Sequence, residues 1–204
     1  MLLSLTKKFL FIANLKTAST SIEQILSPHA EIRLVQSRFG KHQSFSEFSE
    51  RFKWLLSCIN VHELFIFGIM RDPADYVLSL YNSHRTQQFR NAPKLYTGEM
   101  DFGRFITEWV PRNADQLRPQ FTRFVGAEGL VVANLIISYD RLREGLDIVA
   151  DRLDVKELRN LPHVNPSPSP LTRNDLSREH LGWINTRLEK DREFMARYCN
   201  RLLG

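Results

Sequence analysis

The stretch Phe9-Leu10-Phe11-Ile12-Ala13, followed directly by Asn14-Leu15-Lys16-Thr17-Ala18-Ser19-Thr20-Ser21, decides the fold of this chain. The first five residues are apolar and give way at once to polar ones, which is typical of a fully buried strand. Apolar residues then recur at helical spacing over residues 22–26, and Glu23 supplies an early acid. Hydroxyl groups cap exposed N–H groups and an early acid suits the helix dipole, so we predict a strand, a tight turn and a helix that begins at residues 19–21.

The same arrangement recurs twice along the chain. Residues 64–70 are apolar throughout and end at Arg71-Asp72-Pro73, where Pro73 suits the first turn of a helix. A third apolar run covers residues 130–139, and leucine and valine follow it at helical spacing over residues 142–153. Strands without polar alternation, separated by helices, favour a parallel sheet covered on both faces. The sequence therefore predicts an α/β fold with three layers, α/β/α, around a central, mainly parallel sheet.

The composition is that of an ordinary globular protein. The chain has 204 residues, of which 43% are hydrophobic and 25% charged, so we expect a single domain over residues 1–204. Cys58 and Cys199 lack the spacing of a disulfide framework or a zinc site, and we predict no metal site. The 28 basic residues outnumber the 23 acidic ones, and the net charge of +5 favours anionic partners such as phosphates and sulfates.

The sequence contains no stretch that approaches the roughly 20 apolar residues of a membrane span. The apolar residues 1–5 precede Lys7 and Lys8, whereas a signal peptide has its basic residues first. We therefore expect a cytoplasmic protein without a membrane span.

Three further segments complete the predicted organisation. Residues 83–128 are polar and aromatic, and an apolar pattern over residues 102–109 indicates one amphipathic helix within this insert. Alternate prolines predict a loop over residues 163–172, because proline cannot donate a ladder or helix hydrogen bond. An apolar stripe predicts a C-terminal helix over residues 177–203.

The turn after the first strand has the features of an anion site. A helix N-terminus presents free backbone N–H groups and a partial positive charge, and Lys16 adds a full charge. Hydroxyl donors are present at Thr17, Ser19, Thr20 and Ser21. The turn is not a Walker A loop, because it lacks glycine and Lys16 precedes the hydroxyls. The alternative is that the hydroxyls only cap the helix and that Lys16 is solvated.

The hexapeptide Lys16-Thr17-Ala18-Ser19-Thr20-Ser21 resembles the Lys-Thr-Ala-Gly-Thr-Ser signature of sulfotransferases that use 3′-phosphoadenylyl sulfate (PAPS). The resemblance implies a P-loop NTPase-like fold in which residues 16–21, Ala18 included, cradle the 5′-phosphosulfate. Ser19 stands where the family has glycine. If the turn needs a positive φ at this position, serine costs roughly 1 kcal/mol, and otherwise the departure moves the cradle slightly.

Arg71-Asp72-Pro73, which leads to Ser79-Leu80-Tyr81, resembles a second signature of the same family. Arg71 follows a strand at the carboxyl edge of the sheet, where open α/β sheets bind ligands, and Ser79 lies on the helix that follows. The resemblance implies that Arg71 and Ser79 hold the 3′-phosphate of PAPS, and a guanidinium fork suits a phosphate. The alternatives are a salt bridge from Arg71 to Asp72 or Asp75 and an ordinary helical serine at position 79.

Two weaker matches extend the resemblance. Tyr139-Asp140-Arg141-Leu142 is similar to a strand-end Tyr-acid-x-Leu of the family, so Tyr139 contacts the adenine by analogy, while a capping or core tyrosine is equally consistent. His163-Val164-Asn165 looks like a His-x-Asn loop that closes over nucleotide or acceptor in related enzymes. This match implies that Asn165 binds the nucleotide, and the alternative is a proline-stiffened surface connector.

Sulfuryl transfer to a hydroxyl needs a base for the acceptor proton and a cation beside the bridging oxygen of the leaving phosphate. Lys16 suits the second role by place and charge. Histidine suits the first because its pKa lies near working pH, and His42 lies between the two signatures, where related sulfotransferases often have a histidine. The alternative is that His42 is an ordinary histidine of a surface loop. His163, Glu23 and Glu47 are the other candidates for the base. We expect His180 to be an exposed residue of the C-terminal helix.

The resemblance therefore implies transfer of a sulfuryl group from PAPS to a hydroxyl or amine, with release of adenosine 3′,5′-bisphosphate and no required metal. The acceptor is not identified, and carbohydrates, lipids and small molecules are all candidates for the surface formed by residues 83–128 and 163–172. Two alternatives are a diverged P-loop kinase that uses Mg-ATP and a non-catalytic basic module that binds nucleotide or glycan. Basic and acidic residues alternate over residues 187–193, so we expect no nucleic-acid partner. The sequence leaves the oligomeric state open.

Overall fold

A computed structural model describes residues 1–35, 40–161 and 171–203, and the chain divides into two compact units. The first unit comprises Met1–Arg71, Gln120–Val164 and Glu193–Gly204, and the second comprises Asp72–Pro119 and Asn165–Arg192. The insert predicted over residues 83–128 therefore belongs to the second unit only up to residue 119. The expectation of a single domain stays a prediction.

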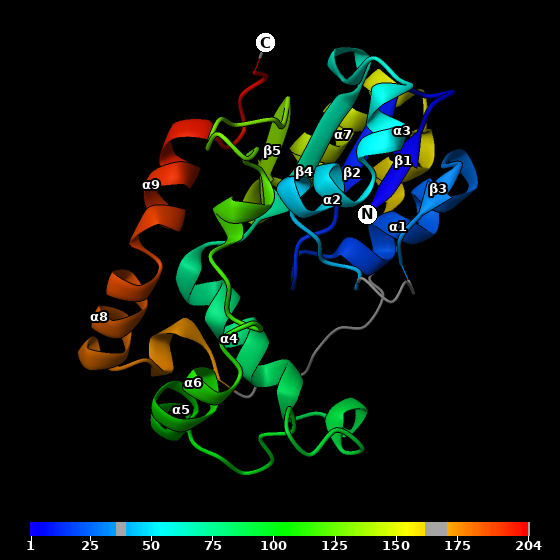
Figure 1. The fold of residues 1–204 in the computed structure, drawn as a ribbon. Coiled ribbons are helices and arrows are strands. Elements are labelled where there is room, and N and C mark those ends of the chain that lie inside the picture. Colours follow the sequence, from blue (N-terminus) through cyan, green and yellow to red (C-terminus); the bar gives the residue numbers. More distant parts are fainter. Residues whose placement is uncertain (36–39, 162–170, 204) are drawn as a thin grey trace. The chain divides into compact units, whose positions relative to one another are not determined.

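The first unit is built around a five-stranded sheet with the order β3-β1-β2-β4-β5 (Figure 1). Its strands are β1 (Leu2–Ser4), β2 (Phe9–Ile12), β3 (Ile32–Arg33), β4 (Phe65–Met70) and β5 (Leu135–Ser138). β2, β4 and β5 pair in parallel, whereas β1 pairs antiparallel with both β2 and β3. β1 is therefore antiparallel to the other four strands, which are parallel to one another. The predicted α/β class with a mainly parallel sheet is confirmed.

Helices pack on both faces of this sheet. On one face, phenylalanines of β2 and β4 pack against α1 (Ser19–Leu26) and α7 (Leu142–Leu153). The other face packs against α2 (Phe45–Arg51), α3 (Lys53–Ser57) and the aromatic ring of Phe194. Every residue of β2, β4 and β5 is buried, and this two-sided cover explains why these strands show no polar alternation.

The three predicted strand–helix units are confirmed, but the third strand is shorter than predicted. Of residues 130–139, only β5 forms strand, because Val131 makes an isolated bridge to Val125 and the Asn134 side chain accepts a hydrogen bond from the N–H of Ile66 (2.8 Å). The sequence analysis predicts neither β1 nor β3, since strands of three and two residues are too short to show a periodicity.

The single C-terminal helix predicted over residues 177–203 is wrong. The chain forms α8 (Arg178–Arg187) and α9 (Glu189–Tyr198), and Leu188 between them leaves the helical conformation with φ −121° and ψ 30°. The Leu188 side chain is 1% exposed, so the break allows a leucine of the stripe to be buried. Residues 199–203 then run beside β5, where the N–H of Asn200 donates to the oxygen of Ile136 (2.8 Å).

In the second unit, α4 (Pro73–His84) begins at Pro73 as predicted, and the Asp72 side chain caps it by accepting from the N–H of Ala74 (2.9 Å). The predicted amphipathic helix over residues 102–109 is confirmed, although it consists of α5 (Phe102–Arg104), a π-helical segment (Phe105–Trp109) and α6 (Val110–Arg112). The Tyr81 ring of α4 meets the Phe102 ring edge-on at 5.3 Å.

His180 of α8 also packs into the second unit. Its ring lies 5.1 Å from the Phe102 ring, and its Nδ1 is buried without a hydrogen-bond partner. The expectation of an exposed His180 is therefore wrong, because an aromatic residue of the insert covers it.

Short 3-10 helices complete the described residues: Ser27–His29, Val61–Glu63, Gln87–Phe89, Gln120–Arg123, Tyr139–Arg141, Lys156–Asn160 and Arg173–Asp175. Most of the loop predicted over residues 163–172, including His163 and Asn165, lies outside the described residues. Among the residues that are described, each helix is too short or too polar to cross a membrane.

Replacement of Gly68 by alanine tests how closely β4 is packed. A methyl group at Gly68 would lie 2.5 Å from Phe124 Cε1 and 2.7 Å from the backbone oxygen of Ile12, which cannot move aside. We expect Gly68→Ala to lower the free energy of unfolding by about 1–3 kcal/mol, measured by urea denaturation. Gly182→Ala is the matched control, because a methyl group there meets nothing within 4 Å and alanine favours a helix. Equal destabilisation by both variants would contradict this packing.

Candidate functional site

The turn between β2 and α1 passes through two left-handed residues, neither of them glycine. Lys16 has φ +61°, and Ala18, the N-cap of α1, has φ +56°. Ser19 is the first residue of α1 and does not have a positive φ, so the cost considered for serine at this position does not arise. The left-handed conformation costs roughly 1–2 kcal/mol for a residue with a side chain. Strain of this kind concentrates at functional sites, which directs attention to the turn.

The N-terminus of α1 has no side-chain cap. The hydroxyl of Thr17 donates instead to the backbone oxygen of Asn14 (3.0 Å), and the first turn of α1 contains no acidic residue. The predictions that hydroxyls cap this helix and that Glu23 lies in its first turn are therefore wrong. The first turn of α1 itself thus carries no carboxylate that offsets the positive end of the helix dipole, which favours an anion there.

The hydroxyl residues of the predicted cradle differ in exposure. Ser19 and Ser21 are buried, at 5% and 3% exposure, whereas Thr20 is exposed. Thr20 accepts a hydrogen bond from the ammonium of Lys41 (3.0 Å). The turn therefore has a second lysine beside it, which the sequence analysis does not assign to the site.

The side chain of Arg71 contacts the turn that carries Lys16. Lys16 follows β2 and Arg71 follows β4, its parallel neighbour, and Arg71 Nη1 donates to the backbone oxygen of Lys16 (3.3 Å). Burial, and then the positive charge of Arg71, lower the pKa of Lys16 to about 8. Asp72, considered above as a salt-bridge partner of Arg71, instead caps α4 and pairs with Arg173 (3.3 Å).

The guanidinium of Arg71 lies over the ring of Tyr139, 4.5 Å from its centroid. This cation–π contact fixes the plane of the guanidinium, and Arg71 Nε is buried without a hydrogen-bond partner. A buried charged donor without a partner is costly, so an anion that accepts from it would be bound favourably. Tyr139 thus belongs to the site through Arg71, and its contact with adenine stays a prediction.

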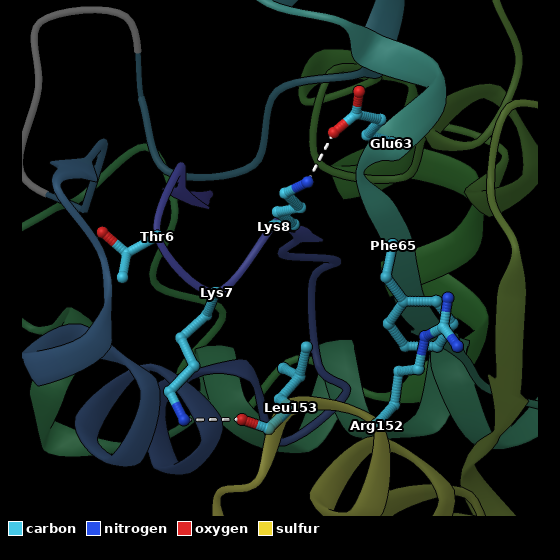
Figure 2. A pocket seen from close by; sticks show the side chains of 7 residues that line it. All are labelled: Thr6, Lys7, Lys8, Glu63, Phe65, Arg152 and Leu153. Carbon is cyan, nitrogen blue, oxygen red and sulfur yellow. Dashed lines mark hydrogen bonds and ion pairs between the residues drawn. The ribbon is translucent and has the colours of Figure 1, made fainter.

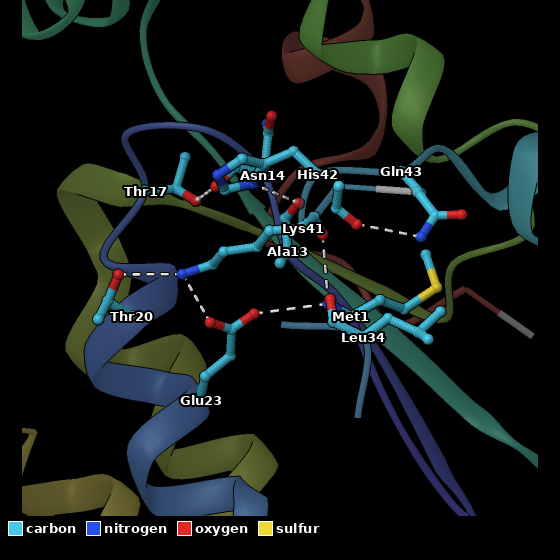
Figure 3. Close-up of polar contacts among 11 residues, drawn as sticks. Met1, Ala13, Asn14, Thr17, Thr20, Glu23, Leu34, Lys41, His42 and Gln43 are labelled. Carbon is cyan, nitrogen blue, oxygen red and sulfur yellow. Dashed lines mark hydrogen bonds and ion pairs between the residues drawn. The ribbon is translucent and has the colours of Figure 1, made fainter. Parts of the chain in front are cut away.

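His42 packs against the end of β2 (Figure 3). Its Nδ1 lies 3.1 Å from the backbone oxygen of Ala13, so Nδ1 carries the proton that is donated and Nε2 is the basic nitrogen. Burial lowers the pKa of His42 to about 3, and the charges of Lys41 and Arg123 act in the same direction. His42 is therefore neutral at pH 7, with its Nε2 lone pair free of a proton.

The two glutamates considered as alternative bases have structural partners. Glu23 is 5% exposed and pairs with the ammonium of Lys41 (2.6 Å), while the nitrogen of Met1 lies 3.4 Å from its other oxygen (Figure 3). Glu47 forms a capping box with Ser44 at the start of α2. Their carboxylates are thus engaged, so among the described candidates His42 is the one without a carboxylate-type structural pairing, while His163 lies outside the described residues.

Two buried side chains at the site, Gln120 and Arg123, belong to no recognisable sequence motif. Gln120 is fully buried and accepts a hydrogen bond from the N–H of Arg71 (2.9 Å). Arg123 is 7% exposed and close enough to His42 to lower its pKa. Both residues belong to the 3-10 helix Gln120–Arg123 in the first unit. The sequence pattern assigns them instead to the insert over residues 83–128, which is why they were not predicted at the site.

For the remaining predicted residues the structure gives no placement relative to this turn. Ser79 is half-buried on α4 and belongs to the second unit. Asn165 and His163 lie outside the described residues. Their roles stay predictions.

A cavity of about 230 Å³ opens at the other end of the parallel strands, and none of the predicted site residues lines it (Figure 2). Its wall includes Phe65, the first residue of β4, together with Lys7 and Lys8. Lys7 Nζ donates to the backbone oxygen of Leu153 (2.8 Å) at the end of α7, and Lys8 pairs with Glu63 (2.5 Å). Both lysines therefore already have partners, and we do not assign this cavity a ligand.

Comparison with protein families, with curated proteins and with solved structures gave no match for this chain. Within the described part of the chain, no three histidine, cysteine, aspartate or glutamate side chains gather as metal ligands would. The expectation that no metal is required is not tested by this observation.

The low pKa of His42 predicts a pH-dependent stability. Between about pH 6.5, the ordinary value, and about pH 3, the unfolded chain binds a proton at His42 that the folded chain does not. The free energy of unfolding should therefore fall as the pH decreases through this window. His42→Asn should reduce that fall, measured by urea denaturation at pH 7 and pH 4.

His62→Asn, at an exposed position, controls for the loss of one imidazole. If His42→Asn and the parent lose the same free energy of unfolding between pH 7 and pH 4, His42 is not held neutral.

Proposed function

We propose that this protein transfers a sulfuryl group from PAPS to a hydroxyl or amine of an acceptor, and that it is a PAPS-dependent sulfotransferase with a P-loop-like, three-layer α/β/α fold. The observation that carries the proposal is that the Arg71 guanidinium donates to the backbone oxygen of Lys16 after adjacent parallel strands, and that its charge helps to lower the pKa of the Lys16 ammonium. Two like charges in a half-buried place repel each other, and a multiply charged anion between them relieves that repulsion. PAPS carries such charges on its 5′-phosphosulfate and its 3′-phosphate.

We assign one group of the chain to each part of the donor. The N-terminus of α1 and Lys16 would bind the 5′-phosphosulfate, because both present positive charge that no carboxylate of the helix's first turn offsets. Arg71 would bind the 3′-phosphate through its unpartnered Nε, together with Ser79. Tyr139 would contact the adenine, and Asn165 would close over the nucleotide.

The proposed reaction requires two contributions from the chain, a cation beside the leaving phosphate and a base for the acceptor proton. The acceptor oxygen or nitrogen attacks sulfur as the bond from sulfur to the bridging phosphate oxygen breaks, and the acceptor proton passes to His42 Nε2. The ammonium of Lys16 stabilises the charge that develops on the leaving phosphate oxygen. A pKa of about 3 makes His42 a weak base, but a bound anion raises the pKa because it stabilises the imidazolium.

The binding of adenosine 3′,5′-bisphosphate without metal, measured by calorimetry, tests the donor site. We expect Lys16→Met and Arg71→Met each to weaken binding about 10- to 100-fold, since a hydrogen bond to a charged group contributes about 1.5–3 kcal/mol. Lys53→Met is the matched control, because Lys53 is exposed on α3. Binding of Mg-ATP but not of adenosine 3′,5′-bisphosphate would instead favour the kinase. Binding without transfer from radiolabelled PAPS to any of a panel of hydroxyl and amine acceptors would favour the non-catalytic module.

The pKa of Lys16 predicts how this binding changes with pH. Lys16 is protonated at pH 7 and loses its proton as the pH rises through about 8. The affinity for adenosine 3′,5′-bisphosphate should therefore fall between pH 7 and pH 9.5, and Lys16→Met should abolish most of this pH dependence. A parent protein with the same dissociation constant at both pH values would show that Lys16 does not contact the anion.

A further inference from the structure

The side-chain amide of Gln120 binds the backbone of Arg71 as a neighbouring strand would. Its Oε1 accepts from the N–H of Arg71 (2.9 Å), and its Nε2 donates to the backbone oxygen of Arg71 (2.8 Å). Arg71 lies directly after β4, so this pair of hydrogen bonds continues the ladder by one residue beyond the strand. The backbone of Arg71 is thereby fixed at the point where the side chain leaves the sheet.

A second amide joins this pair to the turn after β2. Asn14 is 1% exposed, and its Nδ2 donates both to Gln120 Oε1 (3.3 Å) and to the backbone oxygen of Ile69 (3.1 Å). Its Oδ1 accepts from the N–H of Leu15 (2.8 Å), the residue before Lys16. A continuous chain of buried amide hydrogen bonds therefore runs from the Lys16 turn to the Arg71 backbone.

We propose that Gln120 is a positioning residue that, through Asn14, holds the Arg71 guanidinium against the Lys16 turn and so sets the separation of the two cations. The Arg71 side chain itself is held by its contacts with the Lys16 oxygen and the Tyr139 ring, while its Nε has no partner. Two cations do not approach each other without support from their surroundings. The fixed backbone of Arg71 provides this support. The positioning role of Gln120 does not depend on the function proposed above, whereas its expected effect on anion binding rests on that function.

The experiment compares the parent with Gln120→Met, which keeps the length of the side chain and removes both the acceptor oxygen and the donor nitrogen of the amide. The first readout is the pKa of Lys16, followed by NMR of the lysine Nζ and Cε, and it needs no ligand. We expect the pKa of Lys16 to rise above about 8, because the positive charge of Arg71, which after burial is the smaller of the two causes that lower it, then lies farther away. Gln88→Met, at an exposed position, is the matched control and should leave the pKa of Lys16 unchanged.

The second readout is the affinity for adenosine 3′,5′-bisphosphate, which we expect Gln120→Met to lower at least about tenfold at pH 7. An unchanged pKa of Lys16 in folded Gln120→Met overturns the positioning role. If the parent does not bind the nucleotide, the proposed function fails, whereas the pKa comparison still decides the role of Gln120.

A third measurement decides the proposal if Gln120→Met does not fold. The hydrogen bond from Arg71 N–H to Gln120 should slow amide hydrogen exchange at Arg71 in the parent by several orders of magnitude relative to an unprotected amide. Exchange of the Arg71 amide at the unprotected rate would show that Gln120 does not hold this backbone.

Discussion

The close approach of Lys16 and Arg71 is the constraint on which the rest of the site depends. Parallel pairing of β2 and β4 brings the residues that follow these strands to one edge of the sheet, and buried amides then fix both chains there. The resulting positive charge is only partly exposed to water, where an interaction with an anion would be screened less than at a fully exposed site. The uncapped end of α1 adds to the same field.

The turn achieves its shape without glycine. Lys16 and Ala18 both take the left-handed conformation, and the Thr17 hydroxyl bonds back to the Asn14 oxygen and stabilises the bend. The cost of two left-handed residues is offset by the rigid frame around them, which includes buried Thr17 and Asn14. A loop held in this way keeps its backbone N–H groups in a fixed orientation, and preorganised donors stabilise developing charge better than mobile ones.

Sequence patterns were sufficient for the main elements and for the two cations. Apolar runs that end abruptly in polar residues mark the carboxyl ends of buried strands, which is why Lys16 and Arg71 could both be predicted at the carboxyl edge of the sheet. Their direct contact was not predicted, because the resemblance assigns them to opposite ends of the donor. Gln120 could not be predicted, because it contacts Arg71 across 49 residues and no local pattern distinguishes it. The break at Leu188, the very short β1 and β3, and the left-handed Ala18 likewise result from tertiary packing rather than from local preference.

The segment after α9 has a consequence for how the protein is made. Cys199 and Leu202 form bridges to Ile136 and Leu135, so this segment covers part of an edge of the sheet that would otherwise expose free N–H and C=O groups. Such an edge is a template for pairing with another chain. Residues 199–203 are synthesised some 60 residues after β5. During translation the edge strand β5 therefore lacks this cover, and the growing chain is vulnerable to aggregation until residues 199–203 have been made.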